Sequence, residues 1–192
     1  MAKGDIKADL QSIAAGAYLT IQPSTGVAYV THNIYHADAI SVELYDGTNS
    51  LEFISSHDGP GALAYNVHHC TNSIYLRIKN EEAGAELIAY DIVETEASKV
   101  AMALESIDAA DFLDIRPTES GDMWMLHNIY HEGTISVERY DEDENQLEFE
   151  SDRAGPGVLT YYAFGLTYSN RIRVKNEDGS AKLIGYSAVI MG

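Results

Sequence analysis

The sequence HNIYH occurs twice in the chain, at 32–36 and again at 127–131. Two histidines four residues apart could bind one metal ion on a helix, where they would share a face. Both copies lie instead in segments that alternate apolar and polar residues, as strands do. Four residues along a strand span roughly 13 Å, which is too far for one ion. We therefore interpret the motif as structural or as part of an interface; pairing of one histidine from each copy has no further support.

A second cluster, HHC at 68–70, combines two histidines with the only cysteine of the chain. Adjacent strand residues point to opposite faces, so only His68 and Cys70 could converge. The matching stretch of the second half is FGL at 164–166. A metal site common to both halves is therefore excluded, while one confined to the first half stays as a minor alternative.

Signatures of catalysis are missing. The chain has no G-x-S-x-G nucleophile motif, no phosphate loop and no dinucleotide fingerprint. The acidic stretch DEDEN at 141–145 lacks the spaced ligands of a calcium loop, so we expect a solvated hairpin tip, with weak calcium binding as the alternative. We expect no catalytic residue, no cofactor and no metal, and thus a protein that is not an enzyme. A metal-dependent jelly-roll enzyme would need histidines and carboxylates converging inside a barrel, which these strand phases do not supply.

The chain of 192 residues is an internal duplication. Long segments align at a period of about 95 residues with roughly half of the positions identical, and that period suits a complete small domain. DGTN at 46–49 becomes DEDEN, a one-residue insertion of the kind that a surface turn tolerates. We predict two tandem domains, residues 1–95 and residues 96–192.

Alternation with period two predicts strands throughout both halves. In AISVELY, Ile40, Val42 and Leu44 would face a core while the residues between them face water. Turn signals recur every 8–12 residues or so, which predicts seven or eight short strands per repeat. The fold class is therefore all-β, with two antiparallel β-sandwich domains of jelly-roll type. Residues 6–16 and 99–111 are ambiguous between a first strand, which we favour, and a short helix.

Composition excludes several partners. The formal net charge is −18 with only 12 Lys and Arg, so nucleic acid and anionic membranes are unfavourable partners. A single cysteine allows no intrachain disulfide, and no apolar run is long enough for a transmembrane helix. The first residues contain no apolar stretch suited to a secretory signal, so we expect synthesis in the cytoplasm.

Tyrosine is abundant, with 13 residues against 4 Phe and 1 Trp. Tyrosine offers apolar area with a polar tip, which suits protein interfaces and sugar-stacking platforms. Strand propensity and half-buried packing are the simpler explanation, which we favour. Several tyrosines recur in the duplication, among them Tyr65 and Tyr90 with Tyr161 and Tyr186. The candidate interface residues are Tyr35, His36 and Tyr45 with their counterparts Tyr130, His131 and Tyr140.

The segments AYLTIQPSTGVAYVTHNIY and NSIYLRIKNEEAGAELIAYDIV resemble small all-β accessory proteins of tailed viruses. The shared pattern is I-x-P-x-x-G-x-x-W, followed by an I-x-N-I strand and then by a closing R-I/V-K-N strand. The second half keeps the tryptophan of this pattern as Trp124, whereas the first half lacks it. The resemblance covers most of both repeats, and it carries over no catalytic or binding residue.

The resemblance implies a virion structural protein, either a capsid decoration or a tail component, that binds other virion proteins. Self-assembly into a homo-oligomer fits a duplicated chain, with a trimer as one form: three chains would present six similar domains to a six-fold surface. The alternative function is a tandem carbohydrate-binding or adhesin module that uses exposed aromatic rings.

Overall fold

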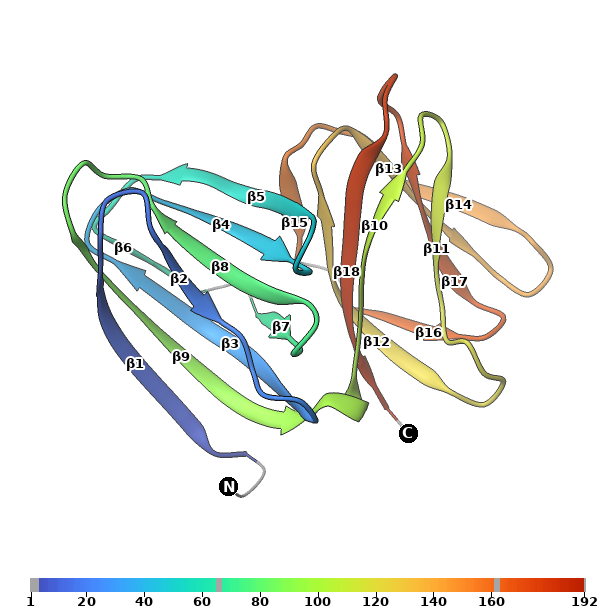
Figure 1. The fold of residues 1–192 in the computed structure, drawn as a ribbon. Coiled ribbons are helices and arrows are strands. Elements are labelled where there is room, and N and C mark those ends of the chain that lie inside the picture. Colours follow the sequence, from blue (N-terminus) through green and yellow to red (C-terminus); the bar gives the residue numbers. More distant parts are fainter. Residues whose placement is uncertain (1–3, 65–66, 161–162, 192) are drawn as a thin grey trace. The chain divides into compact units, whose positions relative to one another are not determined.

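The chain folds into two all-β units, Met1–Val100 and Ala101–Gly192. The computed structural model describes residues 4–64, 67–160 and 163–191. Each unit consists of two antiparallel sheets that form the two layers of a sandwich (Figure 1). This confirms the predicted fold class of all-β, antiparallel, jelly-roll-like halves.

The first unit distributes its strands over two sheets. The chain passes repeatedly between the sheets, so that strands distant in sequence become neighbours, as in a jelly roll. One sheet contains, in spatial order, β1 (Ile6–Ile13), β9 (Glu86–Glu96), β3 (Val27–His36) and then β6 (Gly61–Leu63) and β7 (His68–Cys70), both paired with β3; the other contains β2 (Tyr18–Ile21), β8 (Tyr75–Asn80), β4 (Ile40–Tyr45) and β5 (Ser50–His57).

The second unit repeats this topology strand for strand, as the internal duplication predicts. One sheet contains β10 (Val100–Ile107), β18 (Lys182–Ile190), β12 (Met123–His131) and then β15 (Gly157–Leu159) and β16 (Phe164–Thr167), both paired with β12; the other contains β11 (Phe112–Ile115), β17 (Arg171–Asn176), β13 (Ile135–Tyr140) and β14 (Gln146–Arg153).

Each repeat thus has nine strands within the described residues, one or two more than the seven or eight that the sequence predicts. The difference comes from short strands such as β6 and β7, since three residues are too few to show alternation. Both ambiguous segments form strands, β1 and β10, which confirms the preferred interpretation. A short 3-10 helix, Ala97–Lys99, links β9 to β10.

The core of each unit lies between its two sheets. Ile40, Val42 and Leu44 are fully buried, as their alternation predicts. In the second unit the apolar cluster draws on both sheets, with Leu126 and Ile129 from β12 packed among residues of the opposite layer such as Val174. Burial from two faces of this kind is the main stabilising contribution in a sandwich.

A buried asparagine joins the two layers in each unit. Asn80, at the end of β8, donates through Nδ2 to the carbonyl oxygens of Ile13 (2.9 Å) and Gly84 (2.8 Å). Asn176 repeats the arrangement with Ile107 (2.9 Å) and Ser180 (2.9 Å). The asparagine of the recurrent Lys-Asn pair therefore links the strand it ends, β8 or β17, to the first strand of its unit by a buried hydrogen bond.

Candidate interaction surfaces

The second histidine of each HNIYH motif is a buried corner residue. His36 and His131 are almost completely buried. The Nδ1 atom of each lies close to the backbone carbonyl oxygen two residues later in the chain, at 2.7 Å from Asp38 O and 2.8 Å from Gly133 O. A carbonyl only accepts, so Nδ1 carries the proton and Nε2 is bare. Within the described residues Nε2 has no hydrogen-bond partner in either unit. Burial lowers the pKa of His131.

Two glycines of each GPG segment pack against this corner. A Cβ on Gly157 would lie 3.0 Å from His131 Nε2, and a Cβ on Gly61 would lie 3.0 Å from His36 Nε2. A Cβ on Gly155 would meet the carbonyl oxygen of Gly133 at 2.4 Å. HNIYH and GPG are therefore the two sides of one packed corner, which explains why both motifs recur together.

The HHC cluster is buried in a short strand. All three residues of β7 are inaccessible, and Thr31 Oγ1 lies 3.9 Å from Cys70 Sγ. Burial raises the pKa of Cys70 to about 12 and lowers that of His68 to about 3. At neutral pH the thiol is protonated and the imidazole is neutral, so the cysteine carries no thiolate for nucleophilic attack.

Metal ligands do not gather in the part of the chain that the structure describes: no group of three or more His, Cys, Asp or Glu side chains could hold an ion there. Among these same residues, no helix has the length and apolar character needed to cross a bilayer.

The predicted interface tyrosines occupy different surroundings. Tyr35 is 41% exposed on β3, whereas its counterpart Tyr130 is fully buried on β12. Tyr45 and Tyr140 lie instead in β4 and β13, in the other sheet of each unit. The structure therefore does not bring the six candidates into one surface, and Tyr65 and Tyr161 lie outside the described residues.

An arginine lies between two aromatic rings on the outer side of the β2–β8–β4–β5 sheet. The guanidinium carbon of Arg77 is 3.6 Å from the ring centre of Tyr45 and 4.5 Å from that of Tyr18. Its Nε donates to Glu43, which also accepts from Ser50. These contacts hold the cation in place while leaving part of its surface exposed.

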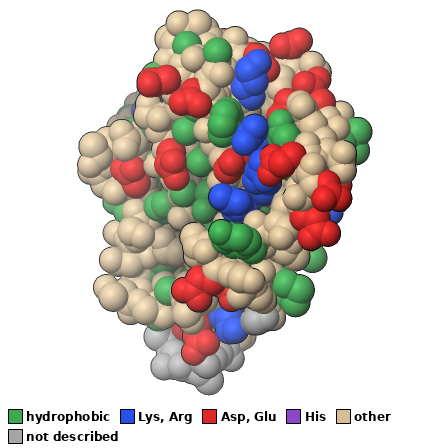
Figure 2. Space-filling view, turned by 90° about the vertical axis from the view of Figure 1, so that its right-hand side faces the viewer, with side chains coloured by type: hydrophobic (Ala, Val, Ile, Leu, Met, Phe, Trp, Pro, Cys, Tyr) green, Lys and Arg blue, Asp and Glu red, His purple; other side chains and the backbone are tan. Residues whose placement is uncertain are grey.

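The second unit repeats this arrangement with Arg173. Its guanidinium carbon is 3.7 Å from the ring centre of Phe112 and 4.6 Å from that of Tyr140, and Nε donates to Asp114 at 2.9 Å. Arg171, two residues earlier on β17, contacts both carboxylate oxygens of Glu144 at 2.9 and 2.5 Å. Figure 2 shows a stripe of Lys and Arg side chains with acidic side chains beside it. We call these two surfaces, centred on Arg77 and Arg173, the arginine–aromatic faces.

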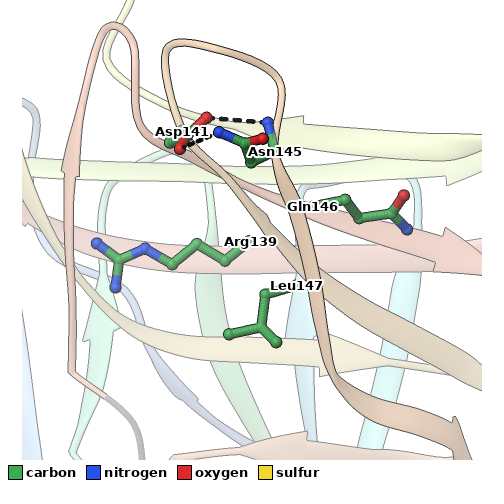
Figure 3. A pocket seen from close by; sticks show the side chains of 5 residues that line it. All are labelled: Arg139, Asp141, Asn145, Gln146 and Leu147. Atoms are coloured by element: carbon green, nitrogen blue, oxygen red, sulfur yellow. Dashed lines mark hydrogen bonds between the residues drawn. The ribbon is translucent and has the colours of Figure 1, made fainter.

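The acidic stretch DEDEN forms the exposed tip of the β13–β14 hairpin, as predicted, and a small pocket lies beside it. Asp141 accepts hydrogen bonds from the backbone and side-chain amides of Asn145, both at 2.9 Å, and these bonds lower its pKa (Figure 3). The pocket holds about 250 Å³ and is lined by these two residues with Arg139, Gln146 and Leu147. The Asp141 carboxylate is thus engaged in capping the turn.

Sequence reasoning missed the arginine–aromatic faces as units. The recurrence of Tyr45 and Tyr140 is visible in the sequence, but the rings of Tyr18 and Phe112 come from strands about 60 residues before Arg77 and Arg173. The available signal was the retention, in both repeats, of an aromatic residue at the start of the second strand.

No protein-family model and no curated protein matches the chain. Solved structures match over almost its whole length at low identity. An oxalate decarboxylase from Lactobacillus farciminis is 7% identical, with 97% of this chain and 77% of that chain covered and a TM-score of 0.30. A cupin 2 conserved barrel domain protein from Leptotrichia buccalis is 11% identical (98% and 91% covered, TM-score 0.30), and a chain of Sulfolobus Turreted Icosahedral Virus is 9% identical (97% and 90% covered, TM-score 0.36).

The strand order of the two sheets in each unit defines the class of the protein as an all-β, jelly-roll-like chain, and the similarity of these solved structures describes the fold alone. The solved structures also correct one prediction. We expected from the missing motifs that the chain is not an enzyme, but the matching structures include an enzyme, the oxalate decarboxylase. Missing sequence motifs are a poor guide here, because catalytic groups on such folds come from separate strands and need no contiguous signature.

Proposed function

We propose that the chain is a structural component of a virus particle, a capsid decoration or a tail protein, that binds other particle proteins through the outer faces of its sandwiches. The observation that carries this proposal is the duplicated arginine–aromatic face. Arg and Tyr are the residues most enriched where proteins meet. Here the contacts of Arg77 and Arg173 already fix both side chains, so a partner would lose little entropy in ordering them.

The proposed particle protein assembles with copies of itself, with a trimer as one form. A duplicated chain supports this, because each copy presents two similar faces and can meet a repeating surface at two points. Two linked contacts bind more tightly than either alone when their spacing matches that of the partner surface.

The test is co-purification with particles. Gradient-purified particles from an infected culture should contain the chain by mass spectrometry. The double variant Arg77→Met, Arg173→Met keeps the aliphatic stems but removes both cations, and it should lower occupancy on particles at least about tenfold. Lys99→Met is the matched control, because Lys99 lies in the connecting 3-10 helix and not in the strands that carry the two faces. A chain that is missing from purified particles would end this proposal.

A tandem carbohydrate-binding module is the second candidate. The rings of Tyr18 and Phe112 favour it, since both are about two-fifths exposed at matching positions of the two units. In each unit, however, a guanidinium already lies against the ring on which a sugar would stack. A glycan array distinguishes the two: binding that both Tyr18→Ala and Phe112→Ala weaken would favour the carbohydrate module over the particle protein.

A further inference from the structure

The outer side of the β1–β9–β3 sheet is apolar and exposed in the first repeat. Ile6 is 77% exposed, Leu10 63%, Leu87 53% and Tyr35 41%. We call these four residues the β1 face. In the second repeat, the counterparts of Ile6, Leu10 and Tyr35 are buried: Val100 is 8% exposed, Leu104 9% and Tyr130 0%.

The register of the strands shows that the β1 face is continuous. Leu10 pairs with Ala89, and Ala89 pairs in turn with Tyr35, so the three side chains form one row across three strands. Leu87 lies on the same side of β9, two residues from Ala89, and Asp91 lies two residues beyond. Asp91 accepts hydrogen bonds from Tyr35 (2.9 Å) and from Asn33 (3.1 Å), which fixes a carboxylate at the border of the apolar surface.

The tip of the β13–β14 hairpin shows the opposite difference between repeats. Leu44 and Leu51 are fully buried in the first repeat. In the second repeat Arg139 replaces Leu44 and is exposed, and Leu147, the counterpart of Leu51, is 64% exposed. Arg139 and Leu147 are paired across the two strands and so lie on the same side of the hairpin (Figure 3). The described residues offer the Arg139 guanidinium no ion pair or hydrogen bond. We call Arg139 and Leu147 the β13–β14 tip.

We propose that copies of this chain associate head to tail, with the β13–β14 tip of one copy docked on the β1 face of the next. Leu147 would pack among Leu10, Leu87 and Tyr35, and Arg139 would pair with Asp91. The inference rests on the self-assembly included in the proposed function and names the surfaces that carry it. Such a contact is heterologous, so it generates either a closed ring or an open filament.

Charge is what selects this pairing over the alternatives. Among the described arginines, Arg77, Arg171 and Arg173 have carboxylate partners within the chain, whereas Arg139 has none, so its cation is available to a partner. The tip offers one cation beside an apolar side chain, and the β1 face offers one anion beside an apolar surface. A symmetric face-to-face or tip-to-tip dimer would instead oppose Asp91 with Asp91 or Arg139 with Arg139, and like charges at an interface are unfavourable.

A mixing experiment with the full chain tests the proposal. Leu10→Thr weakens only the β1 face, and Leu147→Thr weakens only the tip. Both positions are more than three-fifths exposed, and threonine suits a strand, so folding should be unaffected. In sedimentation equilibrium the unmodified chain should self-associate, and each variant should do so at least about tenfold more weakly.

The decisive sample is an equal mixture of the two variants. Each variant keeps one intact surface, so the mixture should form a 1:1 dimer and stop there. Met123→Thr, at a position 50% exposed in the second unit, is the control and should associate like the unmodified chain. A strictly monomeric unmodified chain would overturn the proposal, as would a mixture that gives no heterodimer.

The outcomes also separate this inference from the proposed function. If the chain associates head to tail but is missing from particles, the proposed contact is supported and the proposed function is contradicted. If the chain is present in particles, yet Leu10→Thr and Leu147→Thr leave its self-association in sedimentation unchanged, the proposed function is supported and the proposed contact is contradicted.

Discussion

The imidazoles of His36 and His131 are packing residues of buried corners. Each donates from Nδ1 to a carbonyl and lies against a glycine with little space to spare. Recurrence of a histidine in a duplicated chain therefore reflects a shape requirement in this case. His68 and its counterpart Phe164 differ chemically. The two rings pack similarly, but only the imidazole of His68 can be protonated.

The corner should not tolerate a methyl group on the glycine side. Gly155→Ala places a Cβ 2.4 Å from the backbone oxygen of Gly133, which cannot move alone. We expect a loss of about 2 kcal/mol or more in the free energy of unfolding. Urea unfolding followed by Trp124 fluorescence measures it. Gly165→Ala, which meets nothing within 4 Å, is the control, and equal losses in both variants would contradict the packed corner.

The buried His68 should make stability depend on pH. Its folded pKa of about 3 lies below the unfolded value of 6.5, so its contribution is complete above pH 6.5 and is lost as pH falls toward 3. The slope reaches about 1.4 kcal/mol per pH unit. His68→Phe installs the side chain that the second repeat has at this position, where Phe164 and Phe149 have ring centres 5.1 Å apart, as do His68 and Phe53.

Urea unfolding by circular dichroism between pH 7.5 and pH 4.5 compares His68→Phe with the unmodified chain. The variant should lose less stability over this range. An identical pH slope in the two proteins would show that other groups account for the acid sensitivity.

At the scale of elements, the closing strands β8 and β17 connect most features of each unit. Their outward residues include Arg77 and Arg173, their inward residues fill the core, and their last residues, Asn80 and Asn176, bond to the first strand. Each of these six-residue strands thus contributes side chains to the outer surface and to the core, and a hydrogen bond between the two sheets. This explains why their sequence recurs so closely in the two halves.

Removing the buried amide of Asn176 should loosen β17 from β10. Asn176→Ala leaves the carbonyl oxygens of Ile107 and Ser180 without their donor, at a position with no solvent access. We expect a loss of about 2 to 3 kcal/mol. Chemical unfolding monitored at Trp124 reports it, with Asn170→Ala at the Thr167 turn as control. A loss no larger than that of the control would show that the amide contributes little.

The sequence predicts much of the fold because alternation and duplication are both strong signals. The period-two alternation alone predicts that Val42 and Leu44 are buried, and the Asp46-Gly47 pair indicates the hairpin turn that follows them. Exposure at equivalent positions could not be predicted: Ile6 and Val100 are similar side chains in the same kind of strand, yet one is exposed and the other buried. The β1 face and the arginine–aromatic faces depend on neighbours contributed by distant strands, which no local pattern reports.

At the scale of the whole molecule, the charge of −18 opposes any association between copies. The proposed contact must therefore form against a long-range repulsion that salt screens within about 10 Å at 0.1 M ionic strength. The single attractive pair, Arg139 with Asp91, is short-ranged by comparison. The balance between them sets how assembly responds to its surroundings.

Salt should strengthen self-association for this reason. Between 20 and 200 mM NaCl we expect the dissociation constant, measured by sedimentation, to fall several-fold. Arg139→Gln should associate more weakly at every salt concentration and should show a steeper salt response, because only repulsion remains to be screened. Weaker association of the unmodified chain at higher salt would mean that the ion pair, rather than net charge, dominates.

The one-residue insertion at the hairpin, together with the exchange of Leu44 for Arg139, removes the equivalence of the two halves. The surfaces at the two ends of the chain then differ in shape and charge, and a row of copies joined head to tail is polar. Every addition leaves the same kind of end available, and growth and termination become properties of two distinct sites.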